Sequence, residues 1–117
     1  MDMISDQRTC QKRILAVRDT LDVVGGKWKL VLLTILMTGA RRFQELSREA
    51  GITPRILSKE LKELEMHGLV NRTLVDSRPV KVAYSLTPYS QSLEPVLAAL
   101  HEWGINHRQK FIGSSEI

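Results

Sequence analysis

A short turn between two helical stretches constrains the fold of this chain more than any other feature. Residues 43–49 carry apolar side chains at helical spacing, and the stretch 51–54 (Gly-Ile-Thr-Pro) follows them. Glycine permits a sharp turn, threonine is a good helix N-cap, and proline fits the first helical position, which needs no N–H. A second helix is therefore predicted over 54–67, with Gly68 as its stop. Two helices joined by a glycine turn predict a helix-turn-helix over 43–67.

Two strand-like runs follow this motif. Residues 69–75 and 80–86 are rich in Val, Leu, Thr and Tyr, and the turn cluster Asp-Ser-Arg-Pro at 76–79 separates them. This order predicts a two-stranded β-hairpin, so the segment 69–86 is expected to form the wing of a winged helix-turn-helix. A further short strand is expected over 41–43.

Three more stretches show helical spacing. The stretch 10–24 repeats apolar residues every three or four positions, and 27–37 is apolar nearly all round, which places it in the centre of the core. A threonine–proline pair opens a long predicted helix over 88–111. The predicted fold class is mainly α (α+β), in a single winged-helix domain spanning residues 1–117.

Composition limits the classes of function. The 117 residues include 17 Lys and Arg against 13 Asp and Glu, a net charge of +4 at pH 7, which favours phosphate-bearing partners. One cysteine excludes an intrachain disulfide, and the first ten residues lack the apolar segment of a signal peptide. No apolar run is long enough to span a membrane, so we expect a cytoplasmic, nucleoid-associated protein without membrane contact. The histidines are scattered, and no metal site, cofactor or enzymatic activity is expected.

The helix predicted over 54–67 has two chemically different faces. At about 100° per residue its leucines fall on one side, and its basic and hydroxyl side chains fall on the other. A single α-helix fits the DNA major groove and reads base edges with its N-terminal residues, where an arginine can pair bidentately with guanine. The predicted contacts to double-stranded DNA lie in three places: just before the first helix of the motif, along the second helix with its cap, and on the wing. They are Arg42, Thr53, Pro54, Arg55, Ser58, Lys59, Lys62, Arg78 and Lys81.

The sequence leaves two questions open: the role of the wing arginine and the function of the fold. Arg78 either contacts the DNA backbone, enters a minor groove, or lies in an ordinary surface turn. The same fold also serves as a protein–protein interaction module without DNA binding, with the basic face solvated or meeting an acidic partner.

The first and last helices carry more apolar surface than a small domain covers. A helix over 88–111 would be about 36 Å long, and a three-helix core with a hairpin does not cover that length. We therefore predict a homodimer through 10–24 and 88–111, which in turn predicts a near-palindromic DNA site. Part of the apolar stripe must cover its own domain, and the alternative is that all of it does. The predicted interface residues are Ile14, Leu15, Val17, Leu21, Leu93, Val96, Leu97, Leu100 and Trp103.

Several ordered motifs resemble the HxlR-type winged-helix regulators, a family related to the MarR group. The motifs are Gly-Gly-Lys-Trp at 25–28, Arg-Phe-x-Glu-Leu at 42–46, and the stretches 51–58, 61–65, 68–70 and 82–87. The resemblance covers about residues 10–104. It implies a bacterial or archaeal transcription regulator that binds DNA as a dimer formed by its first and last helices.

Cys10 is a candidate redox sensor. A helix N-terminus and nearby cations both stabilise a thiolate, and Arg8, Lys12 and Arg13 are close in sequence. The resemblance supports this role, because some HxlR-type proteins are thiol-based sensors of quinones, aldehydes or oxidants. Family members often have Cys-Pro where this chain has Cys10-Gln11. The alternative is a small residue that packs at the dimer contact. The effector, the operator and the sign of regulation stay open.

Overall fold

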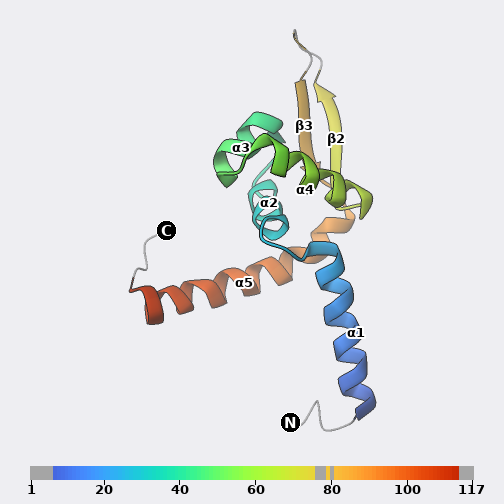
Figure 1. Cartoon of the computed structure of the whole chain (residues 1–117), viewed down its shortest axis with the longest axis vertical. Coiled ribbons are helices and arrows are strands. Elements are labelled where there is room, and N and C mark those ends of the chain that lie inside the picture. Colours follow the sequence, from blue (N-terminus) through green and yellow to red (C-terminus); the bar gives the residue numbers. More distant parts are fainter. Residues whose placement is uncertain (1–6, 76–78, 80, 114–117) are drawn as a thin grey trace.

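The computed structural model describes residues 7–75, 79 and 81–113 (Figure 1). Its elements are α1 (Gln7–Val24), α2 (Lys29–Leu36), β1 (Arg41–Arg42), α3 (Phe43–Ala50), α4 (Pro54–Met66), β2 (Val70–Val75), β3 (Lys81–Leu86), a 3-10 turn (Tyr89–Leu93), α5 (Glu94–His107) and a π turn (Arg108–Ile112). This order confirms the predicted winged helix-turn-helix. Within the described ranges, no helix is both long and apolar enough to cross a membrane.

Helix α2 lies in the centre of the core, as its apolar sequence predicts. Leu32, Leu33 and Leu36 are buried and share one cluster with Leu46 of α3 and the leucines of α4. Each fully buried leucine contributes about 1.5–3 kcal/mol of hydrophobic stabilisation. Burial of one apolar face of α3 and of α4 therefore fixes which face of each helix points outward.

The turn between α3 and α4 forms as the sequence predicts. Gly51 has a φ of +71°, the left-handed conformation that favours glycine, and its N–H donates to the Ser47 carbonyl at 3.0 Å. Ile52 is buried, and its carbonyl accepts a 2.6 Å hydrogen bond from the Ser47 hydroxyl. Thr53 Oγ1 then accepts from the Ile56 N–H at 3.3 Å and caps α4. Helix α3 therefore ends, and α4 begins, at a defined residue.

The wing has one more strand than the predicted hairpin. Strands β2 and β3 pair in antiparallel register from Val70 opposite Leu86 to Val75 opposite Lys81. Strand β1 pairs with the other edge of β3, with Arg41 opposite Tyr84, and gives the order β1-β3-β2. The pairing brings the start of α3 beside the wing.

The long helix predicted over 88–111 is interrupted. Pro95 lacks an N–H, and its ring would clash with the carbonyl four residues earlier, so an unbroken α-helix cannot run through this point. The chain instead makes the 3-10 turn first and starts α5 at Glu94, with Pro95 in the first turn. Thr87 caps this region as predicted, since its Oγ1 accepts from the Ser90 N–H at 3.2 Å.

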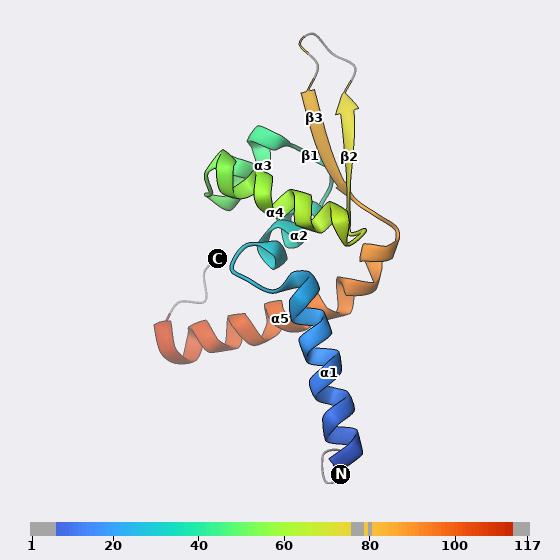
Figure 2. The same ribbon diagram turned by 45° about the vertical axis from the view of Figure 1, so that its right-hand side comes forward.

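Helices α1 and α5 extend away from the body in different directions, and the hairpin extends from the end opposite α1 (Figures 1 and 2). Every residue of α1 from Gln11 to Asp22 is exposed, and only Val24 is buried. The accessible surface of 8787 Å² exceeds the roughly 6500 Å² expected of a compact monomer of this mass. Much apolar helix surface is therefore uncovered in the single chain.

Candidate nucleic-acid interface

Helix α4 presents a basic face to solvent. Leu57, Leu61 and Leu64 anchor the opposite face, each at most 1% exposed. The basic face, defined as Arg55, Ser58, Lys59 and Lys62, is exposed along its whole length. Because the three leucines are buried in the core, the four predicted DNA-contact residues on the opposite face of α4 point to solvent.

Thr53 and Pro54 form the exposed start of α4. The Thr53 hydroxyl already accepts the Ile56 N–H as a cap, and Pro54 occupies the first turn. Both therefore have a structural reason to be present. The capping hydroxyl keeps its own hydrogen, which can donate to a phosphate or a base.

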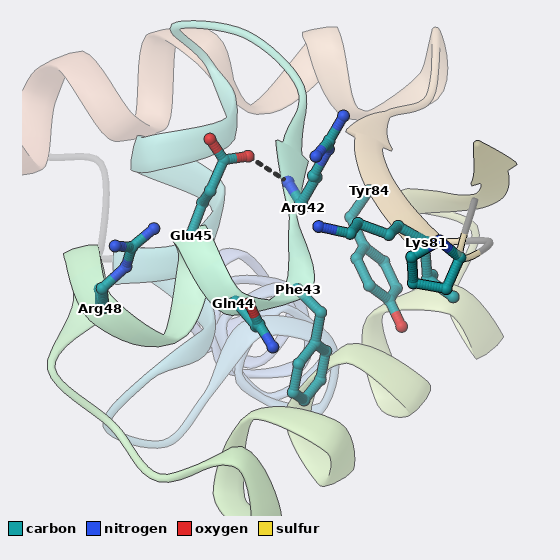
Figure 3. A pocket seen from close by; sticks show the side chains of 9 residues that line it. Arg42, Phe43, Gln44, Glu45, Arg48, Lys81 and Tyr84 are labelled. Carbon is teal, nitrogen blue, oxygen red and sulfur yellow. Dashed lines mark hydrogen bonds between the residues drawn. The ribbon is translucent and has the colours of Figure 1, made fainter. Parts of the chain in front are cut away.

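A cleft of about 560 Å³ separates the start of α3 from the wing (Figure 3). Arg42 and Arg48 line it from the α3 side, and Lys81, Val82 and Tyr84 line it from β3. The pairing of β1 with β3 thus brings together Arg42 and Lys81, two predicted contacts far apart in the sequence. We call this the wing cleft.

A second hollow of about 520 Å³ connects the wing cleft to helix α4. It shares Phe43, Gln44 and Arg48 with the wing cleft and adds Ser47 and Pro54. The wing, the exposed flank of α3 and the first residue of α4 consequently lie along one continuous surface.

The two arginines of β1 differ in their contacts. Arg41 Nε binds the Glu49 carboxylate at 3.0 and 3.1 Å, and its guanidinium also donates to the Thr38 hydroxyl and the Gly39 carbonyl at 2.8 Å. Arg42 is exposed, and its backbone N–H donates to Glu45 Oε1 at 2.7 Å (Figure 3). Arg41 therefore supports the fold, while the exposed Arg42 is one of the residues that line the wing cleft.

Two further features concern the wing. Burial raises the pKa of the Tyr84 hydroxyl, and Arg72, opposite it on β2, partly offsets this rise. Tyr84 is therefore a neutral hydrogen-bonding group at the base of the wing cleft. Arg78, the predicted wing-tip contact, lies outside the described residues.

Sequence reasoning missed two sets of residues near this surface. Gln44 and Arg48 line both hollows, and their spacing of four on the polar side of α3 was the available signal. The second set is an ion-pair cluster behind α4, in which Lys29 contacts Glu60 and Glu63. Its only sequence signal was Lys29, which follows Trp28 and directly precedes the apolar run from Leu30.

The predicted dimer residues divide into two groups. Leu97 belongs to the core of its own chain, and Leu93 packs against that core, because the 3-10 turn folds this segment back onto the body. The remaining residues stay 40–68% exposed: Ile14, Leu15, Val17, Leu21, Val96, Leu100 and Trp103. We call these seven residues the arm faces. Cys10, in the first turn of α1, is half-buried, and the described residues hold no cluster suited to a metal ion.

A helix-turn-helix with an exposed basic second helix and an adjoining hairpin defines the winged helix-turn-helix class. The chain belongs to the HxlR-like helix-turn-helix family, whose model matches residues 23–111. It is 42% identical over 106 residues to the uncharacterized HTH-type transcriptional regulator YtcD of Bacillus subtilis, covering 90% of this chain and 84% of that protein.

Solved structures give the same assignment. The redox regulator HypR in its reduced form aligns with a TM-score of 0.77 at 41% identity, covering 85% of this chain and 99% of that chain. Its oxidized form aligns with a TM-score of 0.73 at 44% identity, covering 76% and 93%. YtcD bears the name of a transcriptional regulator and HypR that of a redox regulator. This chain is a transcriptional regulator with a helix-turn-helix fold.

Proposed function

We propose that this regulator binds double-stranded DNA in a sequence-specific manner, with α4 in the major groove and the wing on the adjacent backbone or minor groove. The observation that carries the proposal is the basic face of α4, held outward by three buried leucines. An arginine in the first turn of a groove-bound helix can read guanine, and lysines one and two turns later can contact bases or phosphates. The wing cleft supports the proposal, because Arg42, Arg48 and Lys81 line one hollow beside this helix.

We further propose that the regulator acts as a homodimer through the arm faces. Their seven apolar side chains lie on the faces of α1 and α5 that the other described residues leave 40–68% exposed. A two-fold dimer presents two copies of α4, and a separation of about 34–36 Å would match one turn of DNA. The operator is then a near-palindrome.

The direct test is selection of binding sites from genomic fragments, followed by titration of the selected duplex in graded salt. Arg55→Ala should weaken binding by about 1–3 kcal/mol and relax the sequence preference. Lys12→Ala is a matched control, because it also removes one exposed positive charge but lies on α1. Each phosphate contact contributes about −0.9 to the slope of log affinity against log salt. A nearly flat slope would favour an acidic protein partner instead.

We also propose that Cys10 makes the regulator responsive to oxidants or electrophiles. Two observations support this role: its place in the first turn of α1, and the likeness to a protein named as a redox regulator in both oxidation states. A disulfide between the Cys10 residues of two protomers would release two protons and two electrons to an oxidant such as diamide. The alternative is that Cys10 only packs at the dimer contact.

A further inference from the structure

Lys29 is the one buried charged side chain in the core of the described part of the chain. It lies in the first turn of α2, and its Nζ donates to Glu60 Oε1 at 2.7 Å and to Glu63 Oε1 at 2.6 Å. The three side chains are 8%, 12% and 38% exposed, in that order. The Lys29 ammonium therefore links α2, the central core helix, to two glutamates that lie about one helical turn apart on α4.

The contacts favour the charged forms of Lys29 and Glu63. Burial alone would lower the pKa of Lys29, but the hydrogen bonds and charges of Glu60 and Glu63 outweigh it and raise the pKa. The hydrogen bond from Lys29 is the main cause that lowers the pKa of Glu63. The cluster thus sets one positive charge against two negative charges on α4.

The acidic residues of α4 offset its basic ones, so where their carboxylates lie affects DNA binding. The helix carries three basic residues (Arg55, Lys59, Lys62) and three acidic residues (Glu60, Glu63, Glu65), so it has no net charge of its own. A polyanion approaching such a helix gains only if the acidic groups are turned away or neutralised. Lys29 holds two of the three carboxylates toward the body and sets its one positive charge against their two negative charges.

Glu63 is the critical partner. It follows Lys59 by four residues, a spacing that brings helical side chains together, and the charge of Lys59 also lowers the pKa of Glu63. Without Lys29, the Glu63 carboxylate would be released to pair with Lys59. Lys59 would then contact DNA less readily.

We propose that Lys29 is a positioning residue of the DNA interface: it holds Glu60 and Glu63 on the body side of α4 and so leaves Lys59 available to the phosphate backbone. This inference rests on the proposed DNA binding. It assigns a binding role to a residue that cannot touch DNA itself, because its side chain is 8% exposed.

The test is a double-mutant cycle measured by DNA affinity. The four proteins are the wild type, Lys29→Met, Glu63→Gln and the double variant, titrated with the selected duplex between about 50 and 200 mM salt. Methionine keeps the apolar stem and removes the charge. Lys27→Met is the matched control, since Lys27 is exposed two residues away and packs over Trp28 rather than α4.

Lys29→Met should weaken binding several-fold and make the salt slope shallower by about 0.9 for each protomer engaged. Glu63→Gln should restore both in the Lys29→Met background and change little in the wild type. A purely structural role predicts another result: thermal stability falls, while the folded protein binds with the wild-type salt slope. That result, or a Glu63→Gln effect equal in both backgrounds, would overturn the inference.

A parallel cycle in the Glu60→Gln background covers the case in which Lys29→Met does not fold. In that background, Lys29→Met leaves only one carboxylate without a partner, that of the more exposed Glu63. The same coupling between Lys29 and Glu63 in DNA affinity is expected. A wild-type protein that binds no duplex would contradict the proposed function and this inference together. Wild-type binding with no coupling between Lys29 and Glu63 would contradict this inference alone.

Discussion

Leu100→Ala measures how much the arm faces contribute to dimerisation. Leu100 is 47% exposed on α5, so about half of its side chain is available for burial against a partner. Complete burial of a leucine is worth about 1.5–3 kcal/mol, which leaves about 1 kcal/mol per copy. A two-fold interface uses the residue twice, so the substitution should cost about 2 kcal/mol of dimer stability. That loss raises the dimer dissociation constant about 30-fold.

Sedimentation equilibrium from nanomolar to micromolar concentration measures this constant. Leu74→Ala is a matched control, because Leu74 is an equally apolar exposed residue on the wing, away from both arms. Leu100→Asp should go further and give monomers that keep their helical circular dichroism but lose cooperative operator binding. A wild type that is monomeric throughout, or a Leu100→Ala constant equal to that of the wild type, would refute the reasoning.

Other predictions concern stability and redox response. Gly51→Ala should lower the free energy of unfolding by about 1–2 kcal/mol in urea, because alanine is strained at a φ of +71°. Gly104→Ala in α5 should instead stabilise by about 0.5–1 kcal/mol, and an equal sign for both would contradict the backbone argument. The pKa of Glu63 is lowered from its ordinary 4.5, so its stabilisation is present above that pH and is lost as pH falls through the folded pKa. Urea unfolding between about pH 3 and 7 should therefore be more acid-sensitive in the wild type than in Glu63→Gln, and parallel profiles would exclude this contribution. Cys10→Ser should bind DNA like the reduced wild type and ignore diamide in a gel-shift assay, whereas a diamide-insensitive wild type would make Cys10 structural.

Local signals in the sequence were sufficient for the helix-turn-helix. The Gly51 turn, the Thr53 cap and the leucines of α4 each act within one or two helical turns, so their geometry follows from neighbouring residues. The basic face of α4 is the complement of its leucine face and was predicted for the same reason. Its contact with DNA stays a prediction.

Features that depend on contacts between distant segments were not predicted. A short strand is predicted over 41–43 and forms at Arg41–Arg42, but its pairing with β3, which makes the wing three-stranded, was not predicted because two residues carry no signal for their partner strand. The cluster of Lys29 with Glu60 and Glu63 joins residues about thirty positions apart. The break before α5 has a local signal in Pro95, which overrides the apolar spacing that predicts one unbroken helix over 88–111.

The central claim is that two copies of α4 enter the major groove of duplex DNA. Dimethyl sulfate footprinting of the selected operator tests it directly, because the reagent methylates guanine N7, which lies in the major groove. The account predicts two protected guanine clusters about 10 base pairs apart, lost in Arg55→Ala and kept in Lys12→Ala. A bound duplex whose guanine N7 atoms all remain reactive would contradict it.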